Sequence, residues 1–217
     1  MKRVLLGVPR VILAVLALGL CLVSAQDLKP IQLPKPQTDG GRPLMQALKN
    51  RKTSREFSTE KLPPQILSNL LWAAFGINRP TGQRTAPSAV NWQEIDIYVA
   101  LSEGLFLYDA KADALQPILA EDVRAATGVQ AYAKDAPVNL IYVADLDKPG
   151  RVPETEKEFW SAADVGFISQ NVYLYCASEG LVSGVRAMID RPALAKIMKL
   201  RPKQKILLAQ SAGYPKK

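Results

Sequence analysis

Residues 63–76 read PPQILSNLLWAAFG, and residues 94–101 read EIDIYVAL. The first stretch opens with two prolines and ends at a glycine, and its apolar residues recur at helical spacing, which indicates an amphipathic helix. The residues of this stripe are Ile66, Leu67, Leu70, Leu71 and Ala74. The second stretch alternates apolar residues with others at a period of two, which is typical of a half-buried strand.

Segments on both sides repeat these two patterns. Strands are predicted at 104–108, as the hairpin partner of 94–101, at 138–144 and at 205–212. Helices are predicted to end near Lys49, to lie within 154–180 and to cover 191–200. A mixed or antiparallel sheet wrapped by helices places the chain in the α+β class.

The first residues are typical of an export signal. Residues 1–25 combine a basic start, a 13-residue apolar run at 11–23 and small residues up to Ala25, which predicts a Sec-type secretory signal peptide cleaved before Gln26. Arg10 makes the run too short for an ordinary spanning helix, although an uncleaved membrane anchor stays an alternative. The proline-rich residues 26–43 are predicted to form an extended arm before a domain at 44–217. The expected location is periplasmic or secreted.

Composition excludes several kinds of chemistry. The chain contains no histidine, so histidine-based triads, histidine general bases and histidine-ligated metal sites are excluded. Cleavage would leave Cys176 as the single cysteine, which cannot form an internal disulfide. No clustered acidic pattern predicts a metal site. The formal charge of +8 is interpreted as an ordinary basic surface and not as a nucleic-acid site.

Three clusters of residues suggest a ligand. Residues 51–55, RKTSR, bring three cations and two hydroxyls together, which suits a phosphate monoester, although such a cluster is also common on a solvated surface. Residues 84–93, RTAPSAVNWQ, contain small residues fixed by a proline, which would let a flat ring approach the backbone. The same composition is also typical of an ordinary loop. Residues 164–171, DVGFISQN, fit a core helix that ends at Gly180.

Together, in this order and spacing, the clusters resemble the nitroreductase family over residues 44–217. Arg51 to Phe57 matches its opening motif Arg-Arg/Lys-Ser/Thr-x-Arg-x-Phe, and Pro87 to Gln93 matches Pro-Ser-Ser/Ala-x-Asn-x-Gln. Gln170-Asn171 and Gly180-Leu181 match the late helix, and 213–215 resembles the closing segment. The strings LLWAAFGINR and RTAPSA are most similar to the branch that includes azoline-forming (thiazole/oxazole) dehydrogenases.

The resemblance implies FMN as cofactor and a homodimer that shares its two sites across an extensive interface. The opening motif would hold the FMN phosphate and ribityl chain through Arg51, Lys52, Thr53 and Arg55. The second motif would approach the flavin of the partner subunit through Pro87, Ser88, Ala89 and Asn91. Gln130 would lie near the ribityl chain or ring edge, and Val185, Ala187 and Met188 near the ring around N5. Val182-Ser183-Gly184 departs from the family's Gly-Leu-Gly, which weakens the match there. The chain stops soon after Gly-Tyr-Pro, so either Lys216 or Lys217 would replace the family's C-terminal phosphate contact or that contact would be missing.

The implied activity is that of an FMN-dependent oxidoreductase. Flavin N5 would exchange hydride or electrons with a nitro compound, a quinone or another small molecule, and no catalytic side chain is predicted. Export makes a nicotinamide donor doubtful, so an oxidase or dehydrogenase fed by another donor is a second interpretation. A flavin-binding or partner-docking module with little turnover is the third. No stable membrane insertion is expected after the signal is cleaved.

Overall fold

The computed structural model describes residues 28–217, so the predicted signal peptide and its cleavage site lie outside the described residues. Its centre is a seven-stranded antiparallel sheet with the strand order β1-β4-β3-β2-β5-β7-β6. The strands are β1 (Ile31–Gln32), β2 (Ile95–Leu101), β3 (Gly104–Asp109), β4 (Ala114–Leu119), β5 (Val138–Asp145), β6 (Val182–Arg186) and β7 (Gln204–Gly213). Every residue of β5 is buried, because this strand lies at the middle of the sheet between β2 and β7.

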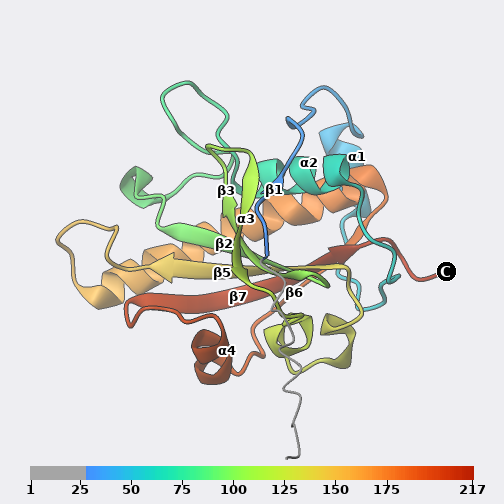
Figure 1. The fold of residues 1–217 in the computed structure, drawn as a ribbon. Coiled ribbons are helices and arrows are strands. Elements are labelled where there is room, and N and C mark those ends of the chain that lie inside the picture. The colour runs from blue at the N-terminus through green and yellow to red at the C-terminus, as the bar shows by residue number, and fades with distance from the viewer. Residues whose placement is uncertain (1–27) are drawn as a thin grey trace, which may run out of the picture.

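Helices cover both faces of the sheet. Figure 1 shows α2 (Pro64–Phe75) and α3 (Glu154–Glu179) on one face, and α4 (Arg191–Ile197) on the other. The short 3-10 helices at Arg124–Thr127 and Ala131–Ala133 lie on the α4 side, and α1 (Leu44–Asn50) packs beside α3. None of the helices within 28–217 is long and apolar enough to cross a membrane.

Sequence dictates where the two principal helices begin and end. Pro64 stands at the start of α2, where a missing N–H costs nothing, and Leu67, Leu70, Leu71 and Ala74 bury one face of the helix in the core. Helix α3 ends at Gly180, whose φ of 74° is the left-handed conformation that glycine adopts without strain. The Leu181 N–H then donates to the Cys176 carbonyl at 2.8 Å and turns the chain into β6.

The α+β class, the helix-wrapped antiparallel sheet and the predicted elements are confirmed within a few residues of their expected ends. Three strands were not predicted: β1, β4 and β6. Strand β4 contains Pro117, which argues against a strand, but the proline lies opposite Phe106 beside a register shift in the ladder. Strand β6 pairs with β7 and forms an edge of the sheet, and this edge carries much of the candidate site.

Candidate functional site

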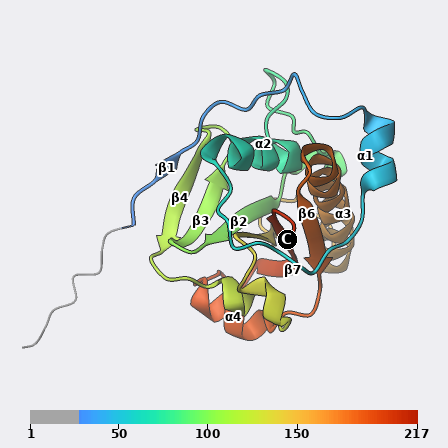
Figure 2. The same cartoon turned by 90° about the vertical axis from the view of Figure 1, so that its right-hand side faces the viewer.

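The cationic segment, Arg51–Arg55, follows directly after α1 and lies along β6. Thr53 forms a parallel bridge to Ser183, and the Ser54 N–H donates to the Ser183 carbonyl at 2.8 Å. A Cβ added to Gly184 would lie 2.5 Å from the Ser54 carbonyl oxygen, so only glycine permits this approach. Figure 2 shows the chain after α1 passing β6 and the C-terminus on its way to α2. The backbone of this predicted phosphate-binding segment is therefore fixed within one chain.

Tyr173 on α3 links the cationic segment to β6. Its hydroxyl accepts a hydrogen bond from the Val185 N–H at 2.9 Å and shares another with the Thr53 hydroxyl at 3.0 Å. The guanidinium of Arg51 lies over its ring, 5.3 Å from the centroid, at a distance where cation–π attraction operates. Sequence reasoning missed Tyr173, since a buried aromatic residue in a core helix gives no signal of such a role.

The C-terminus runs beside the same segment. Phe57 forms an antiparallel bridge to Pro215, and the Ser58 N–H donates to the Tyr214 carbonyl at 2.9 Å. Lys216 follows directly and is exposed, as are Lys52 and Arg55. The fold therefore brings the end of the chain and the opening motif, which are more than 150 residues apart in sequence, to one side of the molecule.

A cavity of about 240 Å³ opens beside the cationic segment. Lys52, Ser183 and Pro215 line it, together with Arg42 and Asn50, which sequence reasoning did not select. Arg42 belongs to the segment that was predicted to be an extended arm. This arm folds back over α3, where the Arg42 N–H donates to the Ser178 hydroxyl at 2.6 Å. The position of Arg42 therefore depends on the path of the arm.

The other predicted ring contacts lie at the end of β6. Val185 is half-buried, whereas Ala187 and Met188 are exposed. Gln130 is brought to the same place, because the Val129 N–H donates to the Met188 carbonyl at 3.1 Å. The side-chain oxygen of Gln130 is buried and has no hydrogen-bond partner among residues 28–217. An uncommitted buried amide oxygen of this kind is available to a ligand.

Arg186, between these residues, is buried and points away from solvent. It donates four hydrogen bonds to uncharged acceptors. The acceptors are the carbonyl and hydroxyl of Thr127, the Ser211 hydroxyl at 2.7 Å and the Asn139 side-chain oxygen at 2.7 Å. Burial lowers the pKa of its guanidinium from the ordinary value. Arg186 thus ties the end of β6 to β5, β7 and the segment before Gln130.

The strained loop, Pro87–Gln93, has a different construction. Val90, Asn91 and Gln93 have φ values of 50°, 57° and 50°, which non-glycine residues rarely adopt. Side chains hold this backbone: the Ser88 hydroxyl accepts from the Gln93 N–H at 3.0 Å, and the Asp164 carboxylate accepts from the Ala89 N–H at 2.9 Å. Pro87, Val90 and Asn91 are exposed, so the tip of the loop faces outward.

One chain does not bring the strained loop and the cationic segment together. The loop contacts α3 at Asp164 and the cationic segment contacts it at Tyr173. Asp164 and Tyr173 are nine residues apart on α3. In an α-helix this places them about 13 Å apart along the axis and about half a turn apart around it. The two groups of predicted flavin contacts therefore lie on opposite sides of α3, with the body of the helix between them.

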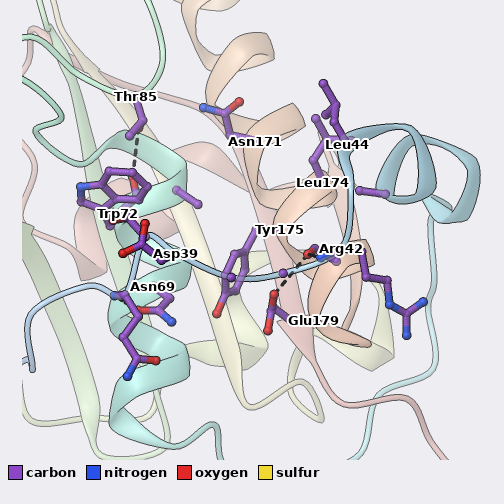
Figure 3. A pocket seen from close by; sticks show the side chains of 17 residues that line it. Asp39, Arg42, Leu44, Asn69, Trp72, Thr85, Asn171, Leu174, Tyr175 and Glu179 are labelled. Atoms are coloured by element: carbon purple, nitrogen blue, oxygen red, sulfur yellow. Dashed lines mark hydrogen bonds between the residues drawn. The ribbon is translucent and has the colours of Figure 1, made fainter.

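A larger cavity, of about 440 Å³, lies between the arm, α1, α2 and α3. Figure 3 shows Trp72 and Asn69 of α2 and Asn171, Leu174 and Tyr175 of α3 around it, with the Thr85 hydroxyl donating to the Trp72 carbonyl at 3.0 Å. Asn171 of the late-helix motif lines it, as do Trp72, Ala73 and Thr85 from the strings LLWAAFGINR and RTAPSA, and none of the predicted FMN contacts lines it. Helices α1 and α3, which border the cavity, carry the exposed apolar side chains of Leu44, Met45, Leu48 and Phe167, and Leu44 lines the cavity itself.

The residues near β6 fit FMN. Arg51, Lys52 and Arg55 supply donors of the kind that binds a phosphate dianion. Gln130 supplies a free amide oxygen for a hydroxyl or imide donor. The small cavity lies between Lys52 and the start of β6, and Arg51, Arg55 and Gln130 do not line it. The structure thus places eight of the predicted residues in one region: Arg51, Lys52, Thr53, Arg55, Gln130, Val185, Ala187 and Met188, with Lys216 alongside.

Comparison with known proteins points to one family. The model of the Nitroreductase family matches residues 48–214. A nitroreductase-family protein of Methanocaldococcus jannaschii is 30% identical over 186 residues, which cover 81% of this chain and 92% of that protein.

Two solved structures share the fold. A crystal structure named as a nitroreductase from Ralstonia eutropha superimposes with a TM-score of 0.84 at 40% identity, over 89% of this chain and 92% of that one. The NADPH:FMN oxidoreductase of Vibrio harveyi, solved with NAD⁺, has a TM-score of 0.61 at 17% identity, over 80% and 69% of the two chains.

Proposed function

The chain belongs to the nitroreductase family, whose members are generally flavin-dependent oxidoreductases, and we propose that it binds FMN and reduces or oxidises a small organic molecule. The observation that carries this proposal is the cationic segment held against β6 by Tyr173, Ser183 and Gly184. When bound there, FMN supplies hydride exchange at its N5 atom. The described side chains position the cofactor and exclude water from one face.

Each residue of this region has a defined part in the proposal. Arg51 and Arg55 bind the phosphate as charged donors, and the Thr53 hydroxyl adds a neutral contact. Lys216 approaches the phosphate from the C-terminus. Gln130 accepts from the ribityl chain or the ring edge, and the backbone around Ala187 and Met188 lies against the ring. The exposed cations Lys52, Arg55 and Lys216 also attract an anionic cofactor from solution.

A second copy of the chain completes the site in this proposal. The strained loop lies too far from the cationic segment to reach the same flavin within one chain, so its Pro87, Ser88, Ala89 and Asn91 would approach the flavin of a partner. Exposed apolar residues on α1, α3 and the loop support the proposal that a second copy covers this side of the chain, because large exposed apolar patches mark interaction surfaces. They are Leu44, Met45, Leu48, Val90 and Phe167.

Nitro compounds and quinones are the proposed substrates, and the periplasm or exterior is the proposed location. The location follows from residues 1–25, and it predicts a mature N-terminus at Gln26 by mass spectrometry. An intact Met1 on the soluble protein would contradict export. The link to the azoline-forming branch stays a prediction based on LLWAAFGINR and RTAPSA, and in that case a peptide would be the substrate.

The direct test is to purify the chain and titrate it with FMN and with riboflavin. The proposal expects tight FMN binding with a perturbed visible spectrum, weaker riboflavin binding, and bleaching by NADPH or dithionite that is reversed by a nitroaromatic compound or a quinone. A chain that binds FMN but exchanges no electrons with any donor or acceptor would be the flavin-binding module instead. A chain that binds neither flavin would contradict the proposal.

A further inference from the structure

Glu94 is a buried acid with no role in the proposed flavin contacts. It stands between the strained loop and β2, and its side chain is completely inaccessible to solvent. Neither of its carboxyl oxygens has a hydrogen-bond partner among residues 28–217. An ionised carboxylate in such a place is unfavourable, because burial removes its water and the backbone and the Ser161 hydroxyl offset this loss only in part. A neutral, protonated carboxyl is far less costly there.

Asp164, the second buried acid at this place, supports the strained loop. It comes from α3, is almost fully buried, and accepts the hydrogen bond from the Ala89 N–H at 2.9 Å. Val90, directly after Ala89, is a β-branched residue with positive φ, and such backbone costs of order 1–3 kcal/mol unless its surroundings hold it. The carboxylate of Asp164 thus holds the start of the strained part, and Glu94 stands at its end.

Glu94 and Asp164 lie close enough for each to influence the pKa of the other, and among residues 28–217 neither acid forms an ion pair with a cation. The Ser161 hydroxyl of α3 is another polar group at this place; it is buried, and it lowers the pKa of Glu94. The nearby charged groups are engaged elsewhere: Asp145 of β5 by Arg201 at 2.5 Å, Asp96 of β2 by Lys148 at 2.7 Å, and Arg84 by the Phe75 carbonyl at 3.0 Å.

Both acids are shifted toward the protonated form. Burial raises the pKa of Glu94, the backbone and Ser161 oppose this, and the charge of Asp164 raises the pKa further. Burial also raises the pKa of Asp164, against the effect of the Ala89 N–H and of Glu94. Two such carboxyls release their protons as a coupled pair, the second at a higher pH than a solvated acid would.

We propose that Glu94 and Asp164 hold one proton between them, and that this proton keeps the strained loop seated on α3. In this arrangement Glu94 carries the proton and is neutral. Asp164 is ionised, and its carboxylate accepts the hydrogen bond from the Ala89 N–H. Loss of the proton leaves two negative charges in one dry site, and the pair separates by releasing the loop. The conformation of residues 88–93 therefore depends on pH.

The sign of the effect follows from the raised pKa values. A carboxyl whose pKa is higher in the folded than in the unfolded chain contributes stability below the unfolded pKa, and this stability is lost as pH rises through the folded pKa. Acidic conditions thus favour the seated loop, and alkaline conditions favour its release. Resting on the proposed function, the same release would open the flavin site of the partner subunit, because the loop forms one wall of it.

The experiment measures the flavin-free protein, so it does not depend on whether the proposed function is right. Hydrogen exchange of residues 88–93, corrected for the intrinsic effect of pH, and the midpoint of thermal unfolding are followed from about pH 5 to pH 9. The wild-type loop should lose protection as pH rises, and the midpoint should fall by roughly 3 to 5 °C per pH unit between the ordinary pKa of a carboxyl and the raised folded pKa of the pair, and level off above it. Glu94→Gln, which resembles the protonated acid, should keep its protection and lack this slope.

Glu103→Gln is the matched control, because Glu103 lies in the turn after β2, pairs with Lys61 on the surface and has a lowered pKa. It should behave as the wild type over this range. Protection of the Ala89 amide that stays constant to pH 9 in the wild type would overturn the proposal, even if Glu94→Gln fails to fold. Equal slopes in wild type and a folded Glu94→Gln would overturn it as well. Adding FMN afterwards tests the proposed function separately.

Discussion

The cationic segment and the strained loop are held in place by different kinds of contact. Backbone pairing to β6 fixes Thr53 and Ser54, while their neighbours Lys52 and Arg55 extend into solvent. The loop has two short-range backbone hydrogen bonds of its own, from the Asn91 and Trp92 N–H groups, and side chains attach it to its surroundings: Ser88 and Asp164 accept the N–H groups of Gln93 and Ala89. The first region has its final form in one chain, whereas the second depends on a few side-chain acceptors and, through one of them, on protonation.

This difference suggests a division of roles. A segment fixed by a sheet edge suits a permanent grip on a cofactor, because its donors need no rearrangement before binding. A loop with unfavourable backbone angles on a few supports suits a wall that opens and closes, because a small change in those supports alters its stability.

The largest effect is expected for Arg186→Met, which removes the anchor beneath the end of β6. Methionine fills similar space but leaves the oxygens of Asn139 and Ser211 without their charged donor. The free energy of unfolding should fall by about 3 to 5 kcal/mol, as is usual when a buried charged network is broken. Urea denaturation measures it, with exposed Arg151→Met as the control, expected within about 0.5 kcal/mol of wild type. A loss below about 1 kcal/mol would mean that β6 does not depend on this anchor.

The next effect concerns Arg51→Ala and Arg55→Ala. Each removes a charged donor worth about 1.5 to 3 kcal/mol, so FMN affinity should fall roughly ten- to a hundredfold. Riboflavin, which lacks the phosphate, should bind almost as before, and Arg151→Ala should leave both affinities unchanged. Calorimetric titration distinguishes these cases. Wild-type FMN affinity in both variants would show that the phosphate is bound elsewhere.

A smaller effect compares two serines, one in each region. Ser88→Ala removes the acceptor of the Gln93 N–H and should cost about 0.5 to 1.5 kcal/mol of stability in the flavin-free protein. Ser54→Ala should cost less, because the Ser54 backbone makes the contact with β6 and its hydroxyl contacts only the nearby Glu56 at 3.3 Å. Equal losses in urea denaturation would remove the distinction between backbone-held and side-chain-held regions.

Much of the fold follows from sequence periodicity, but short pieces at the edges do not. The apolar stripe of α2 and the alternation in β2 predict these elements within about one residue. Strand β6 has five residues interrupted by Gly184, and its strand conformation depends on pairing with β7, which local sequence does not encode. The same is true of β4, where pairing overrides the effect of Pro117.

The candidate site was predictable where a motif lies in one stretch of chain. Arg51, Thr53 and Arg55 are close in sequence, so their residue types alone suggest a phosphate site. The contributions of Tyr173, Arg42 and the Glu94–Asp164 pair depend on long-range contacts, since Asp164 meets Ala89 across 75 positions. Nothing in a single sequence states that these residues meet, and a buried glutamate before a strand resembles a solvated one until the fold covers it.

The central claim, a flavin site shared between two copies of the chain, is tested most directly with a hybrid dimer. One chain carries Arg51→Glu and Arg55→Glu, the other carries Ala89→Phe, and two affinity tags select the mixed pair. Each variant alone should bind little FMN, since every site then lacks one half. The hybrid should recover about half of the wild-type FMN content, because one of its sites receives an intact half from each chain. A hybrid that binds no more FMN than the separate variants would contradict the claim, as would an Ala89→Phe dimer that binds FMN normally.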